Sequence, residues 1–106
     1  MNNRSRRLLD LAHMTCICMN CGRVGAGCEP AHQNGLASGK GIGVKGHDNR
    51  HAALCHDCHA WLDQGGKGRD PSGRYEATRE DKRELWIAAH LATFDHYWRQ
   101  GWIVVV

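Results

Sequence analysis

The strongest pattern of apolar positions lies towards the end of the chain. Four large apolar side chains recur at spacings of four, three and four residues, which is the period of one helical face: Ile87, Leu91, Phe94 and Trp98. Acidic residues occupy the opening turns of the same stretch, where the helix macrodipole favours negative charge. We therefore predict a helix over residues 78–100, with this stripe and the nearby Trp86 and Trp102 in the core.

Weaker patterns predict the remaining elements. A partial apolar face in residues 3–13 predicts a short helix, and Glu29–Gln33 could form one arm of a hairpin. A second helix is expected over Cys58–Gln64, and the two glycines that follow, Gly65 and Gly66, are expected to end it. Trp102–Val106 predicts a final strand. Two glycine-rich segments are expected to be loops, residues 33–48 and 65–74.

Length and composition limit the architecture. A chain of 106 residues suffices for one small domain with a modest core, so a bound metal would add materially to its stability. Six cysteines and eight histidines are many for this length. The sequence has no apolar run typical of a signal peptide or of a transmembrane helix. We therefore expect a cytoplasmic protein with no membrane partner, in which paired cysteines bind metal rather than form disulfides.

Charge is distributed unevenly along the chain. Residues 1–75 carry ten Lys and Arg against six Asp and Glu, whereas residues 76–106 carry four against five. The basic residues thus accompany the cysteine-bearing part, which is compatible with a polyanionic partner and equally with an ordinary solvated surface. In the glycine-rich segment over residues 33–48, Lys40 and Lys45 could contact a phosphate backbone that approaches closely. The alternative is a simple surface loop.

Two Cys-x-x-Cys pairs give the clearest chemical signal. The pairs are separated by 33 residues and consist of Cys18 with Cys21 and Cys55 with Cys58. Four thiolates are the closed tetrahedral ligand set of structural Zn²⁺, so we predict that these cysteines bind zinc. Cys16 lies too close to Cys18 along the chain to chelate well, and Cys28 is expected to be a small buried apolar side chain.

A second metal chemistry is available beside the second pair. His59 follows Cys58 directly, and Asp63 lies one helical turn further on the same face. A histidine and a carboxylate with open positions for water and phosphate suit Mg²⁺ or Mn²⁺. His32 could take a proton from water, which completes the parts for phosphodiester hydrolysis. The other nearby histidines are expected to be solvated: His47, His51 and His56. Of these, His51 could also reach a phosphate.

The order of these motifs resembles a known enzyme family. A Cys-x2-Cys pair, Ala31-His32, a Gly/Lys-rich loop and Leu-Cys-x2-Cys-His are similar, over residues 16–66, to the zinc-bearing HNH (His-Me finger, ββα-metal) endonucleases. More narrowly, they resemble the prophage YbcO-like nuclease family. The resemblance implies a small zinc-bound ββα-metal core. With the N-terminal helix and the long C-terminal helix that the apolar patterns predict, we expect one α+β domain over residues 1–106.

The resemblance also implies roles for individual residues. His32 would be the general base that deprotonates the attacking water, and His59 and Asp63 would bind the catalytic Mg²⁺ or Mn²⁺. In many HNH enzymes the residue just before the base is an acidic or histidine metal ligand, and here that residue is Ala31.

The residue that would orient His32 is left open. Asn49 is the candidate asparagine, but Arg50 occupies the place where the family usually has it, so Asp48 or a backbone carbonyl could serve instead. Arg50 joins Lys40 and Lys45 as a candidate contact to DNA.

The sequence supports three functional hypotheses. We predict a metal-dependent HNH endonuclease of phage or prophage origin that cleaves DNA. The main alternative is a non-catalytic zinc module that binds nucleic acid, in which His32 and Asp63 have no role. A third is a protein-interaction module built on the long helix and its tryptophans, which exposure of the apolar stripe would favour. A homodimer is compatible with any of these, because isologous dimers are common among small proteins.

Overall fold

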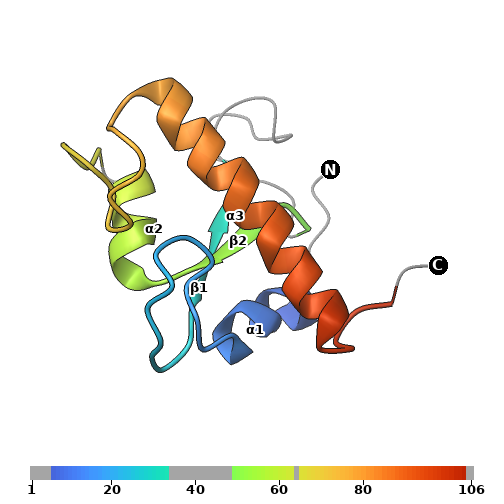
Figure 1. Cartoon of the computed structure of the whole chain (residues 1–106). Helices are drawn as coiled ribbons and strands as arrows, with labels where there is room; N and C mark the ends of the chain where they lie inside the picture. The colour runs from blue at the N-terminus through green and yellow to red at the C-terminus, as the bar shows by residue number, and fades with distance from the viewer. Residues whose placement is uncertain (1–5, 34–48, 64, 105–106) are drawn as a thin grey trace.

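The computed structural model describes residues 6–33, 49–63 and 65–104 (Figure 1). The elements in chain order are α1 (Arg6–Met14), β1 (Glu29–His32), β2 (His51–Leu54), α2 (His56–Asp63) and α3 (Arg79–Arg99). The strands form an antiparallel sheet in which Glu29 pairs with Leu54 and His32 with His51. The described chain is therefore a small α+β domain, as predicted.

The predicted elements differ from the observed ones mainly at their ends. The described part of the first helix ends at Met14. The second helix begins at His56, two residues before the predicted start, and α3 has Thr78 as its N-cap, with the Thr78 hydroxyl accepting from the Asp81 N–H at 3.0 Å. Trp102 is wrong as a strand start: its N–H donates to the Tyr97 carbonyl at 2.9 Å, so the chain turns back onto α3.

The edge of β2 that faces away from β1 has no neighbouring strand in the described chain; its backbone groups bond to α3 and to the segment before β1 instead. The Ala53 N–H donates to the Thr93 hydroxyl of α3 at 2.9 Å, and the Ala53 carbonyl accepts from the Met19 N–H at 3.0 Å. Two residues earlier on β2, the His51 carbonyl accepts a hydrogen bond from Nδ1 of His90 at 2.8 Å. The helix α3 and the segment before β1 thus satisfy backbone groups that a third strand would otherwise use.

The face that α3 buries differs from the predicted one. Its buried residues are Leu85, Trp86, Ala89, Thr93 and Tyr97. The predicted stripe is largely exposed: Ile87, Leu91 and Trp98 have exposed fractions of 42%, 64% and 55%. Both faces of the helix carry apolar side chains, so periodicity alone could not choose between them. The small Ala89 and Thr93 allow the helix to approach β2. The Thr93 hydroxyl accepts a hydrogen bond from the Ala53 N–H, and no side chain of the stripe has an acceptor for it.

Two groups of buried side chains form the core of the described part of the chain. The larger one lies between the sheet, α2 and α3, and contains Cys18, Ala31, Ala52, Leu54, Cys58, Trp61, Leu62, Leu85, Trp86 and Ala89. Trp86 is buried as predicted, and its indole N–H donates to the Ala31 carbonyl at 2.9 Å. The smaller group lies under α1 and contains Ala12, Cys28 and Ala53. No helix in the described part of the chain has the length and apolar character needed to cross a membrane.

Candidate metal centres

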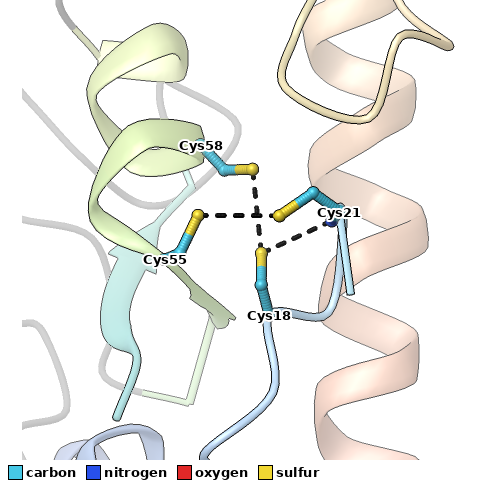
Figure 2. Close-up of side chains that lie close together, drawn as sticks. All are labelled: Cys18, Cys21, Cys55 and Cys58. Atoms are coloured by element: carbon cyan, nitrogen blue, oxygen red, sulfur yellow. Dashed lines mark hydrogen bonds between the residues drawn. The ribbon is translucent and has the colours of Figure 1, made fainter. Parts of the chain in front are cut away.

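The four cysteines predicted to bind zinc gather at one point, with their sulfurs directed towards one another (Figure 2). The four Sγ atoms lie within 4.8 Å of each other, and the Cys18–Cys58 and Cys21–Cys55 distances are both 3.7 Å. In a tetrahedral zinc site with Zn–S bonds of about 2.3 Å, neighbouring sulfurs lie about 3.8 Å apart. The four-cysteine centre could therefore hold a metal ion such as zinc.

Local backbone structure explains how each pair is presented. Cys18 and Cys21 lie in a tight turn that is closed by the hydrogen bond from the Gly22 N–H to the Cys18 carbonyl at 3.0 Å. Gly22 has φ of +78°, a conformation that glycine adopts without strain. Cys55 directly precedes α2 and Cys58 lies in its first turn, so the second pair is fixed by the start of that helix.

Amide groups surround the sulfurs on the turn side. The backbone N–H groups of Asn20 and Cys21 lie 3.4 and 3.5 Å from Cys18 Sγ, and the Asn20 side-chain amide lies 3.3 Å from Cys58 Sγ. Donors in these positions stabilise negative charge on sulfur. The hydrogen bond between Cys18 and Cys58 lowers the pKa of Cys18 and raises the pKa of Cys58, so it favours the thiolate on Cys18 and opposes it on Cys58.

A buried carboxylate holds this turn from outside. Asp70 is 3% exposed and accepts hydrogen bonds from the Asn20 side-chain amide at 2.8 Å and from the Ser72 and Tyr75 N–H groups at 2.7 and 2.6 Å. Burial acts to raise the pKa of Asp70, but the bonds from Ser72 and Asn20 outweigh it and hold this pKa below its usual value. The segment predicted as a loop, residues 65–74, thus supports the cysteine turn through Asp70.

The two remaining cysteines stand apart from this centre. Cys28 is 4% exposed, its thiol donates to the Ile17 carbonyl at 3.3 Å, and burial raises its pKa to about 12. Its predicted role as a small buried side chain is confirmed. Cys16 is exposed and is not a member of the cluster.

A second cluster forms around His59 on a different face of α2. His59 Nε2 lies 2.8 Å from an Asp63 carboxylate oxygen, and His59 Nδ1 lies 2.8 Å from a Glu29 oxygen. The other Glu29 oxygen lies 3.1 Å from Nδ1 of His56. These side chains line an open cavity of about 180 Å³ together with Ala60. We call this group the Glu29–His59–Asp63 cavity.

The positive charge of a protonated His59 and the negative charges of Glu29 and Asp63 stabilise one another in this cavity. The hydrogen bond to Asp63, followed by the one to Glu29, raises the pKa of His59 against the opposing effect of burial. Burial acts to raise the pKa of Glu29, but its hydrogen bonds with His59 and His56 bring the pKa below its usual value. The imidazole is therefore held between two carboxylates, an arrangement in which both ring nitrogens donate protons.

The predicted catalytic residues are only partly brought together. His59 and Asp63 meet as the helical spacing predicted, whereas His32 is not among the residues that line their cavity. Side chains alternate along a strand, so Glu29 and Ala31 share one face of β1 and His32 belongs to the other. The His32 ring lies 6.4 Å from that of His51, its partner across the sheet.

Two of the remaining predicted residues, Asn49 and Arg50, directly precede β2. Asn49 is exposed, and the Arg50 carbonyl accepts from the Gln33 N–H at 3.1 Å, which extends the hairpin by one pair. Lys40 and Lys45, like Asp48 and most of the predicted loop 33–48, lie outside the described residues.

The sequence did not predict the surroundings of His51 and His56, or the presence of Glu29 in the cavity. His51 was expected to be solvated, but it is fully buried, and its Nε2 lies 2.8 Å from the Tyr97 hydroxyl. His56 is exposed as expected, yet it contacts Glu29. Glu29 itself had one usable signal, its position two residues before Ala31, but only the strand register shows that it faces α2.

Comparisons with protein-family models, with curated proteins and with solved structures find no match. The chain is therefore characterised by its own architecture: a small α+β domain with a four-cysteine centre that could hold zinc.

Proposed function

We propose that this protein is a zinc-stabilised, metal-dependent endonuclease of the HNH type that hydrolyses DNA phosphodiester bonds. The observation that carries the proposal is the meeting of His59 and Asp63 with Glu29 in one open cavity beside the four-cysteine centre. An imidazole and two carboxylates that open to solvent fit a hard divalent cation that retains water and accepts phosphate oxygens.

Glu29 supplies what Ala31 lacks in this proposal. It lies two residues earlier on the same face of β1, and its carboxylate already reaches His59 at 2.8 Å. Glu29, His59 and Asp63 would together hold Mg²⁺ or Mn²⁺. Such an ion, when bound, polarises the phosphate and stabilises the leaving oxygen.

The chain's own groups have distinct tasks in this scheme. Both ring nitrogens of His59 contact carboxylates, so binding of a cation would release the proton from one nitrogen and break its carboxylate contact, while the carboxylate on the other nitrogen would keep the ring oriented. His32 remains our prediction for the group that takes the proton from water, with Asn49, Asp48 or a backbone carbonyl as the group that orients it. Arg50, Lys40 and Lys45 are the proposed contacts to the DNA backbone.

A cleavage assay tests this function. The zinc-loaded protein is incubated with supercoiled, linear and branched DNA in the presence of Mg²⁺ or Mn²⁺. We expect cleavage that falls about 100-fold or more in Glu29→Gln, Asp63→Asn and His32→Ala, because each removes a ligand or the proton acceptor. His13→Ala, an exposed histidine of α1, is the matched control and should cut like wild type. Full activity in Glu29→Gln would remove Glu29 from the mechanism.

The second candidate is a non-catalytic zinc module that binds nucleic acid. It is favoured by one observation, the absence of His32 from the residues lining the Glu29–His59–Asp63 cavity. In that case binding to DNA weakens with salt and survives both Glu29→Gln and His32→Ala, and no divalent-dependent product forms with any substrate.

A further inference from the structure

The solvent side of α3 carries an apolar surface with no counterpart within the described chain. We define the α3 stripe as Ile87, Leu91, Phe94 and Trp98. Ile87, Leu91 and Trp98 are 42%, 64% and 55% exposed, whereas Phe94 is half-buried at the edge of the stripe, where its ring also packs against His51 of β2. Figure 1 shows α3 crossing the molecule with one side away from the sheet. We propose that this stripe pairs with the α3 stripe of a second copy of the chain, with the two helices antiparallel.

The spacing of the stripe suits helix pairing. Apolar side chains that alternate between three and four residues apart form a continuous seam, in which knobs from one helix enter holes on the other. With a two-fold axis between Leu91 and Phe94, Leu91 faces Phe94 of the second copy and Ile87 faces Trp98 of the second copy. Each large aromatic ring thus meets an aliphatic side chain, and the seam runs for about 16 Å along the helix.

The charges beside the stripe select the direction. Glu84 and Asp95 lie on the same flank of the stripe. In a parallel pair, this flank would face the opposite flank of the second helix, and Glu84 would lie about 22 Å along the axis from Arg99 of the second copy, so the two charges would not meet. In the antiparallel pair, Glu84 lies opposite the last turn of the other helix, where Arg99 is held on this flank by its ion pair with Asp95 at 2.7 Å. This complementarity argues for a second copy as the occupant.

An isologous contact of this kind uses one patch on both subunits, and it leaves the Glu29–His59–Asp63 cavity on α2 outside the interface. The proposal is therefore independent of the endonuclease activity.

The test is the mass of the zinc-loaded full chain in solution. Light scattering after size exclusion and sedimentation equilibrium, over a concentration series, should show a dimer. Leu91→Glu should weaken it by about 100-fold or more, because a charge would enter the seam. Met14→Glu is the control, since Met14 is also exposed (52%) but lies on α1, and its dimer should match wild type. A wild-type monomer throughout, or a dimer untouched by Leu91→Glu, overturns the proposal.

A charge exchange tests the antiparallel direction. Glu84→Arg alone and Arg99→Glu alone should each weaken the dimer by about tenfold, and the double variant should recover most of the loss. Circular dichroism and zinc content should stay unchanged in all three. A dimer that is sensitive to Leu91→Glu but indifferent to both charge changes would overturn the antiparallel register.

Discussion

The two clusters on α2 differ in nearly every physical respect although their residues are neighbours in sequence. Cys58 and His59 are consecutive, yet Cys58 points into a closed group of four sulfurs and His59 into an open cavity. Cys58 is fully buried, whereas the side chains of His59, Asp63 and Glu29 are 25%, 34% and 39% exposed. The four cysteines offer soft sulfur ligands that complete a tetrahedral shell. The residues of the cavity offer harder oxygen and nitrogen ligands and leave room for further ligands.

The difference separates a structural task from a chemical one. Four thiolates fill a tetrahedral shell, so nothing else can reach a metal held there. Two carboxylates and an imidazole leave positions for water and a substrate oxygen. Because both clusters share the start of α2, closure of the first fixes the backbone that carries His59 of the second. The following predictions test this division, beginning with the largest expected effect.

Loss of the four-cysteine centre should unfold the domain. Zinc binding to small structural sites is worth about 10–16 kcal/mol, which is as large as the whole stability of a typical domain, about 5–15 kcal/mol. We expect Cys58→Ser, or a strong chelator applied to the wild type, to abolish the far-ultraviolet circular dichroism of the folded chain together with its bound zinc. Cys16→Ser is the control, because Cys16 is exposed and outside the cluster, and it should keep both signals.

Removal of the outer support should weaken the centre without destroying it. Asp70→Ala leaves the Asn20 amide and the Ser72 and Tyr75 N–H groups without their acceptor, and we expect a loss of about 3 kcal/mol in the free energy of unfolding. Urea unfolding of the zinc-loaded protein measures this loss. If Asp70→Ala were as stable as wild type, the loop would not support the turn.

The open cavity should tolerate a change that the closed centre does not. Glu29→Gln keeps the shape of the side chain, so we expect the fold and the zinc content to remain, while the affinity for Mn²⁺ falls about 10- to 100-fold. A titration followed by electron paramagnetic resonance of Mn²⁺ measures this affinity. His13→Ala is again the matched control. Equal Mn²⁺ affinity in Glu29→Gln and wild type would place the ion elsewhere.

The smallest effect is expected at an ion pair that joins the two cysteine-bearing segments. Arg23 lies 2.7 Å from Asp57 of α2, but both side chains are more than half exposed, so solvent screens their attraction. Arg23→Ala should therefore leave zinc content and Tm unchanged within error. A clear fall in either would mean that the surface contact, and not only the sulfurs, holds the cysteine turn against α2.

Features set by short stretches of sequence were predictable. The four-cysteine centre follows from two chelating spacings, and α3 from a long periodic segment with Thr78 as its cap. His59 and Asp63 share a face because they are four residues apart on one helix.

Features set by pairing between distant segments were not predictable. Glu29 reaches His59 only because β1 pairs with β2 in the register that sets Glu29 opposite Leu54. The buried face of α3 was predicted wrongly because the fit of Ala89 and Thr93 against β2 outweighs the size of the apolar stripe. His51 is buried for a related reason, since the rings of Phe94 and Tyr97 on α3 enclose it.

The hydrogen bonds along the outer side of β2 have a consequence for how the protein can associate. An unprotected strand edge recruits strands from other chains and seeds aggregation. Here Thr93, His90 and Met19 already engage the polar groups of Ala53 and His51, so strand addition at this edge would first require α3 to detach. Assembly through the surface of α3 carries no such requirement, and it would in addition lock the helix over the strand that it protects.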